Sequence, residues 1–145
     1  MYLMLFGILI AAVITDLTED IIPNLLVLLG AILGIVCQIV EGGQLFFSLG
    51  DAALILLCLI PIYMIGGLGA GDVKLLALIP LYIGLESTAN LIISAFLAGA
   101  VCSAIKFAYS KAIKIPTTKM TIHFTVPIFF GAILTLIGGI QWITI

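Results

Sequence analysis

Charged side chains are scarce in this sequence. Only 8% of the 145 residues are charged, arginine is absent, and the formal net charge at pH 7 is −2. A hydrophobic content of 64% and a mean hydropathy of +1.45 exclude an ordinary soluble domain and predict an integral membrane protein. The length allows a single domain over residues 1–145. Because no basic patch has interleaved aromatic residues, we do not expect a nucleic acid as a partner.

Cysteine is also scarce, and its spacing argues against a metal or disulfide framework. Cys37, Cys58 and Cys102 lie in separate apolar runs, and no C-x-x-C pair exists. We expect these three side chains to serve as small apolar packing residues. The sequence therefore predicts no metal and no organic cofactor.

Long apolar runs dominate the chain and predict an all-α, polytopic fold with about six transmembrane helices. Residues 1–15 lack a basic n-region and an A-x-A-like cleavage site, so we expect a retained membrane helix there. Five spans is the main alternative, because the fourth run is short and contains Pro80. We expect the polar residues 86–88 and Asn90 to separate the fourth run from the fifth. The runs are 1–15, 24–40, 45–65, 75–85, 89–109 and 124–144.

The lysines predict how these spans are oriented. With six spans, the loops 16–23, 66–74 and 106–123 lie on one side of the membrane and contain all five lysines of the chain. The opposite side has none, so the positive-inside rule assigns the lysine-bearing side to the cytoplasm. Asp16 and Asp72 both fall on that side, at similar depth. The lysines from 106 to 119 are expected to be topological anchors that can also contact anionic membrane lipid.

A glycine-rich turn precedes Asp72 in the segment Gly66-Gly67-Leu68-Gly69-Ala70-Gly71-Asp72-Val73-Lys74. A carboxylate at the edge of the hydrocarbon is costly unless it is paired or solvated, so Asp72 is a functional candidate. Gly69 and Gly71 allow a tight turn and a close approach of another chain. The alternative is a helix-terminal acid favoured only by the macrodipole. Lys74 can position this turn or a substrate, or serve as a simple anchor.

A second acid, Asp16, begins the segment Asp16-Leu17-Thr18-Glu19-Asp20-Ile21-Ile22-Pro23-Asn24. Pro23 suits the first turn of the second span, and Asn24 can cap that turn or bond a neighbouring carboxylate. Glu19 and Asp20 are expected to be solvated loop charges. Considered without Asp72, Asp16 could likewise be a solvated acid at a helix end.

Two aspartates close together at a low-dielectric boundary do not both ionise easily, so they share a proton. One member can then act as the base on a water that attacks a peptide carbonyl, while the other protonates the leaving group. Such a pair titrates as a unit. Asp16 and Asp72 are therefore candidates for acid–base hydrolysis of a peptide bond.

The two segments resemble the signature blocks of type IV prepilin peptidases, which are membrane aspartyl proteases of the GxGD type. The resemblance rests on Asp16-Leu17, Ile22-Pro23-Asn24 and the stretch from Gly66 to Leu75. It extends to the last span, through Thr125-Val126-Pro127 and Gly131-Ala132.

This resemblance implies that Asp16 and Asp72 are the catalytic pair. It implies an enzyme of the prokaryotic cytoplasmic (inner) membrane that cuts a short basic leader peptide from prepilin or pseudopilin precursors at the cytoplasmic face. Longer members carry an insert with C-x-x-C pairs that is associated with zinc and N-methylation. This chain has no such insert, so methyltransfer is not implied, and its size resembles the short subgroup that serves Flp/Tad-type pili. Glu19 and Asp20 stand in a loop that is often basic in the family, and we expect them to attract the leader's cations.

Two alternatives remain at this level. A presenilin-like intramembrane protease shares the G-x-G-D turn, although the nearest match to its Pro-Ala-Leu element is Val126-Pro127-Ile128. A small transporter or a non-catalytic assembly factor could also carry paired acids, but a transporter would place them near the midplane, often with inverted repeats. His123, just before the last span, is expected to be an interfacial polar group rather than a catalyst.

Overall fold

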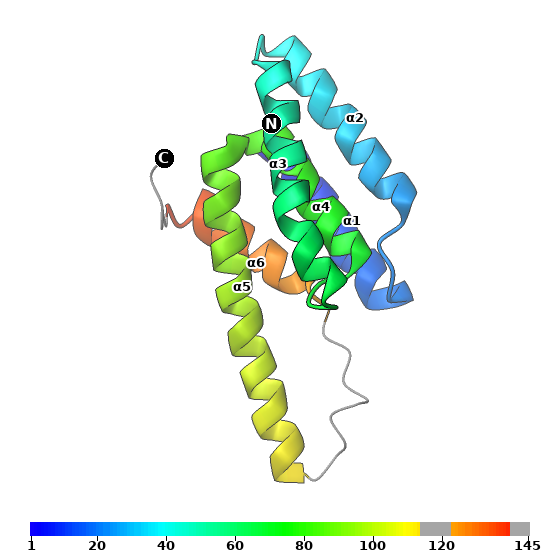
Figure 1. The fold of residues 1–145 in the computed structure, drawn as a ribbon, viewed down its shortest axis with the longest axis vertical. Helices are drawn as coiled ribbons and strands as arrows, with labels where there is room; N and C mark the ends of the chain where they lie inside the picture. Colours follow the sequence, from blue (N-terminus) through cyan, green and yellow to red (C-terminus); the bar gives the residue numbers. More distant parts are fainter. Residues whose placement is uncertain (114–122, 140–145) are drawn as a thin grey trace.

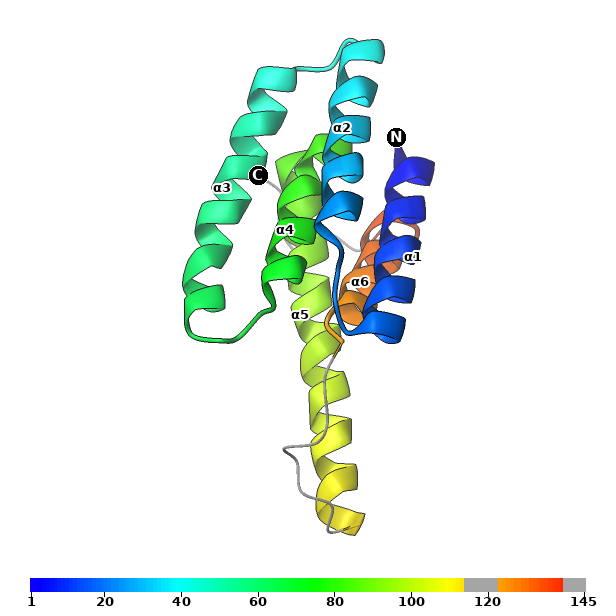
Figure 2. The same ribbon diagram turned by 90° about the vertical axis from the view of Figure 1, so that its right-hand side faces the viewer.

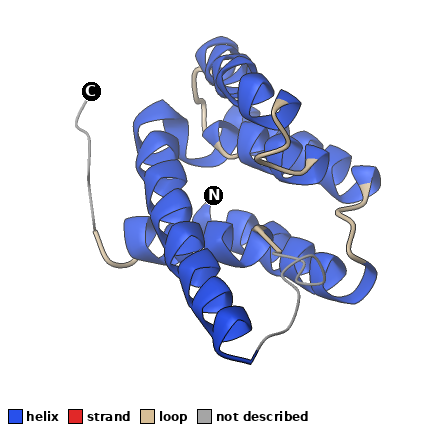
Figure 3. Cartoon of the chain, turned by 60° about the horizontal axis from the view of Figure 1, so that its bottom comes forward, coloured by secondary structure: helices blue, strands red, loops and turns tan. Residues whose placement is uncertain are grey.

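The computed structural model describes residues 1–113 and 123–139. In these residues it contains helices and loops and no strand (Figures 1 and 3), so the predicted all-α class is confirmed. The helices are α1 (Tyr2–Glu19), α2 (Asn24–Val40), α3 (Leu45–Met64), α4 (Ala70–Leu78), α5 (Pro80–Ile113) and α6 (Thr125–Leu136).

Three helices are long and apolar enough to cross a membrane. They are α1, α3 and the part of α5 from Pro80 to Tyr109, whereas α2 and α6 are apolar but shorter. The apolar helices indicate a membrane protein. The number of six spans stays a prediction. Large apolar side chains on the outer surface agree with this, as Leu3, Phe46 and Ile65 are each more than four-fifths exposed.

The fourth and fifth apolar runs do not separate where the sequence predicted. Residues 86–88 lie inside α5, and the helical backbone is instead interrupted at Gly84, where φ is 75°. Polar side chains stay in the helix there because they bond to its own backbone. Thr88 Oγ1 donates to the Gly84 carbonyl at 2.6 Å, and Asn90 Nδ2 donates to the Glu86 carbonyl at 3.1 Å.

The helices alternate in direction, so two sets of connections gather at opposite ends of the bundle (Figures 1 and 2). One end holds the α1–α2 connection, the α3–α4 loop and the start of α6. The other end holds the N-terminus and the α2–α3 turn, where the Met1 amino group lies 3.5 Å from the Glu41 carboxylate. The end of α1 and the start of α4, which carry Asp16 and Asp72, therefore share one end of the molecule.

The short helix α4 forms the centre of the core. Leu75 and Leu76 of α4 are almost fully buried, as are Leu5 of α1 and Ile128 of α6. Contacts from α2, α3 and α5 also reach α4. Burial of this face fixes the position of α4 and of the acid in its first turn.

Helix α6 is held against α5 by close backbone contact at Gly131. A Cβ atom at Gly131 would lie 2.8 Å from both the Ala95 nitrogen and the Leu91 carbonyl oxygen. No real Cβ contact is that short, so any larger residue must push the two helices apart.

This contact generates a stability prediction. We expect Gly131→Ala to lower the apparent Tm of the detergent-purified protein by several degrees, because backbone atoms on α5 cannot move aside cheaply. Gly50→Ala in α3 is the matched control, since a Cβ there meets nothing within 4 Å. The control should keep or raise the Tm, because alanine is the better helix former. Equal thermal stability of the two variants would contradict the packing described for α6.

Candidate active site

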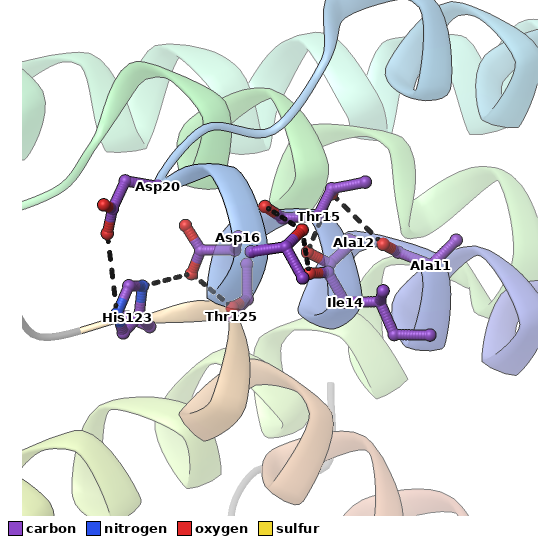
Figure 4. A network of polar contacts seen from close by, with 9 residues as sticks. Ala11, Ala12, Ile14, Thr15, Asp16, Asp20, His123 and Thr125 are labelled. Atoms are coloured by element: carbon purple, nitrogen blue, oxygen red, sulfur yellow. Dashed lines mark hydrogen bonds and ion pairs between the residues drawn. The ribbon is translucent and has the colours of Figure 1, made fainter.

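Asp16 lies in the last turn of α1, with its side chain only 13% exposed. Two groups, one from the first residue of α6 and one from just before that helix, reach its Oδ2 atom (Figure 4). Thr125 Oγ1 donates a hydrogen bond to it at 2.6 Å, and His123 Nδ1 lies 3.4 Å away. The carboxylate is therefore held by a segment more than one hundred residues later in the chain.

Asp20 ends α1 and faces the same histidine. It is the C-cap residue, with a left-handed φ of 56°, and its backbone N–H bonds to the Asp16 carbonyl. Its Oδ1 lies 3.6 Å from His123 Nε2, although the side chain is 73% exposed. We predicted a solvated charge for Asp20, and the structure adds this contact; Glu19 is exposed, as expected.

Asp72 is the third residue of α4, and Gly69 is the N-cap residue of that helix. The backbone N–H of Gly69 hydrogen-bonds to the Asp72 carboxylate, as the third-position acid does in a capping box. A Cβ at Gly69 would lie 2.9 Å from Asp72 Oδ2, and one at Gly71 would lie 2.9 Å from the Cβ of Ile22. Both glycines therefore leave room that the acid and the α1–α2 connection fill.

Lys74 links the start of α4 to the start of α2. Its Nζ donates to Asn24 Oδ1 at 2.8 Å. Pro23 is the N-cap residue of α2, one position before the first turn predicted for it, and α2 has no side-chain cap. Asn24 thus bonds a cation rather than capping its helix or meeting a carboxylate.

Asp16 and Asp72 line the same pocket, of about 440 Å³. Most of the residues singled out from the sequence lie around it, namely Asp20, Asn24, Gly69, Gly71 and Lys74. Glu19 and Pro23 do not line it. Asp72 also lines a second cavity, of about 650 Å³, together with Phe96, Gly99, Ser103 and Phe124.

Burial controls the protonation of Asp72, which lies outside the three helices long enough to span a membrane. Burial raises the pKa of Asp72 from its ordinary value of 3.8 to about 6, and the nearby charge of Asp16 acts in the same direction. The Gly69 N–H and His123 lower this pKa and offset part of the rise. The Oδ1 atom is buried without a hydrogen-bond partner among the described residues. Asp72 can therefore hold a proton at a pH where an ordinary aspartate is ionised.

Metal ligation is not offered by this arrangement. Within residues 1–113 and 123–139, no group of three or more His, Cys, Asp or Glu side chains is placed to hold a metal ion.

Thr125 and His123 are the site residues to which sequence reasoning gave no role. Thr125 was noted only as part of a segment resembling the last span of a known family, and His123 was expected to be an interfacial group. The available signal was weak: a single histidine and a threonine next to an otherwise apolar run.

The chain matches the sequence model of the type IV leader peptidase family over residues 3–104, more than half of its length. No curated protein and no solved structure matches the chain. Asp16 and Asp72 lie inside the matched region, whereas His123 and Thr125 lie beyond it.

The raised pKa of Asp72 generates a prediction about thermal stability. Below about pH 3.8 both the folded and the unfolded chain carry the proton, so this group does not affect folding. As pH rises from 3.8 to about 6, only the unfolded chain loses the proton, and the folded state becomes relatively less stable. We therefore expect Asp72→Asn to raise the apparent Tm at about pH 7.5 and to lose that advantage towards about pH 4.

The measurement is thermal unfolding in detergent across this pH range, with Asp51→Asn in α3 as the control for the change of side chain. For Asp51→Asn, the Tm difference from the wild type should be the same at about pH 7.5 and about pH 4. A Tm difference for Asp72→Asn that is the same at both ends of the range would contradict the raised pKa.

Proposed function

Since the chain belongs to the type IV leader peptidase family, we propose that it is an aspartyl endopeptidase whose catalytic pair is Asp16 and Asp72. The observation that carries this proposal is the single pocket lined by both acids. The proton-holding tendency of Asp72 gives the pair the asymmetry that acid–base hydrolysis needs.

In the proposed reaction, the Asp16 carboxylate removes a proton from a water molecule, and the oxygen of that water bonds to the carbonyl carbon of the scissile peptide. Asp72 donates its proton to the leaving nitrogen as the C–N bond breaks. The new carboxyl terminus and the new amine then leave. The pair still carries one proton, now on Asp16, and proton exchange with water restores it to Asp72. The reaction consumes one water molecule and needs no other reactant.

The proposed substrates are prepilin or pseudopilin precursors, from which the enzyme removes a basic leader. The proposed location is the cytoplasmic membrane of a prokaryote, with the pocket at the cytoplasmic face and anionic lipid around the lysines. Glu19 and Asp20 are exposed at the same end of α1, which supports a role in attracting the cationic leader. Lys114 and Lys119, which contribute to the orientation argument, lie outside the described residues.

A direct test is co-expression with a candidate prepilin and detection of leader removal on gels. We expect Asp16→Asn and Asp72→Asn each to abolish cleavage while membrane insertion and abundance stay unchanged, because neither acid can replace the other. Asp51→Asn, the same change outside the pocket, should cleave like the wild type. Retention of half the activity by either pocket variant would rule out the pair.

The glycine turn can be tested in the same assay. Gly69→Ala puts a methyl carbon 2.9 Å from Asp72 Oδ2, so the carboxyl must move, while the extended backbone of Gly69 (φ −71°) still accepts alanine. We expect kcat/KM to fall by about a hundredfold with little change in Tm, because misplacing a catalytic group is costly. Gly7→Ala in α1, where a Cβ meets nothing within 4 Å, should leave kcat/KM unchanged and keep or raise the Tm. Normal cleavage by Gly69→Ala would show that the turn does not position the acid.

A further inference from the structure

Thr125, the first residue of α6, and His123, two residues before it, both place a polar side chain against Asp16. Thr125 is only 1% exposed, and its hydroxyl donates to Asp16 Oδ2. His123 lies between Asp16 and Asp20, as Figure 4 shows. A buried hydroxyl in a chain this apolar must find an acceptor, and here the acceptor is an acid of the proposed pair.

We propose that Thr125 and His123 are positioning residues that keep Asp16 in its carboxylate form and so assign it the role of base in the pair. This inference rests on the proposed function and deepens it. It explains which of two chemically identical side chains takes the proton from water.

Thr125 favours the carboxylate through the strength of its hydrogen bond. The Oγ1–Oδ2 distance of 2.6 Å falls in the short range that hydroxyl groups reach with ionised acceptors. A hydroxyl can donate to an ionised Oδ2 or accept from a protonated one, and the charge-assisted bond to the ionised oxygen is the stronger of the two. The contact therefore stabilises the carboxylate more than the neutral acid.

His123 favours the carboxylate through charge. Its Nδ1 lies 3.4 Å from Asp16 and its Nε2 lies 3.6 Å from Asp20. A neutral imidazole donates from one nitrogen only, whereas an imidazolium donates from both, so the charged form is the one that satisfies both acids. The left-handed backbone of Asp20 at the end of α1 helps to bring the second acid beside this ring.

The charged groups around His123 come from several elements. Asp16 and Asp20 face it from α1, and the Asp72 carboxyl of α4 is close enough for the histidine to affect its protonation. Helix α5, which packs against α6, carries Glu86 near its start and Lys106 towards its far end.

Asp72 lacks comparable support. Its Oδ1 has no hydrogen-bond partner in the described part of the chain, and the backbone N–H of Gly69 is the donor that favours its ionised form. The donors are thus concentrated on Asp16, and the shared proton is left to Asp72.

The threonine is tested with a conservative pair of substitutions in the cleavage assay, measured across pH. Thr125→Val keeps the shape but removes the hydroxyl, so we expect about a tenfold lower kcat/KM. The acidic limb of the kcat/KM profile should also move to higher pH, because the base loses a donor that favours its ionised form. Thr125→Ser retains the hydroxyl and should restore the wild-type profile. Thr135→Val is the matched control on α6, where the lost hydroxyl lies 3.4 Å from Ser94 Oγ instead, and it should leave the pH profile unchanged.

The histidine is tested by two amides that imitate its two nitrogens. The amide nitrogen of His123→Asn takes the place of Nδ1 and can still donate to Asp16. That of His123→Gln takes the place of Nε2 and can donate to Asp20. We expect the asparagine variant to keep the larger share of kcat/KM, with similar Tm values for the two variants.

Two results would overturn the inference. A Thr125→Val enzyme with an unmoved acidic limb, whatever its rate, would reduce Thr125 to a packing residue. Equal activity of His123→Asn and His123→Gln would remove the contact with Asp16 from the explanation. Failure of the proposed function is distinguishable, because Asp16→Asn would then cleave like the wild type regardless of any change in α6.

Discussion

The cost of keeping a carboxylate in an apolar, partly buried position is the constraint on which this structure depends. Asp72 meets that cost by holding its proton up to about pH 6, and Asp16 meets it by accepting a hydrogen bond from Thr125 and facing His123. Two acids in the same pocket thus meet the cost of burial in two different ways. That difference converts two aspartates into a potential acid and a potential base.

The fold supplies the rest by packing α4 at the centre of the bundle. Its buried face fixes the helix, Gly69 lets the first turn close on Asp72, and the Lys74–Asn24 hydrogen bond ties that turn to α2. Helix α6 reaches the site from the far end of the sequence because Gly131 lets it lie directly on the backbone of α5. The residues that contact the two acids are therefore largely different from the residues that pack α4 and α6 into the bundle.

The sequence was sufficient to predict that Asp16 and Asp72 lie at the same end of an all-helical bundle, where they line one pocket. This was possible because alternating apolar runs and a glycine turn are local patterns that constrain topology. The break at Gly84 was missed because Thr88 and Asn90 look like loop residues until their bonds to the helix backbone are seen. The contacts of Thr125 and His123 with Asp16 were missed because they join residues about one hundred positions apart, and no local pattern encodes such a contact. The number of spans depends on how short helices such as α2 and α6 sit in a bilayer, which hydropathy alone does not determine.

The claim that the two acids act as one unit can be measured without any substrate. Carbon-13 NMR of carboxyl-labelled aspartate would follow the titration of Asp72 in the wild type and in Asp16→Asn. We expect Asp72 to titrate near pH 6 in the wild type and at a lower pH in the variant, because the charge that adds to the effect of burial has been removed. An identical titration of Asp72 in both proteins would contradict the coupling of the pair.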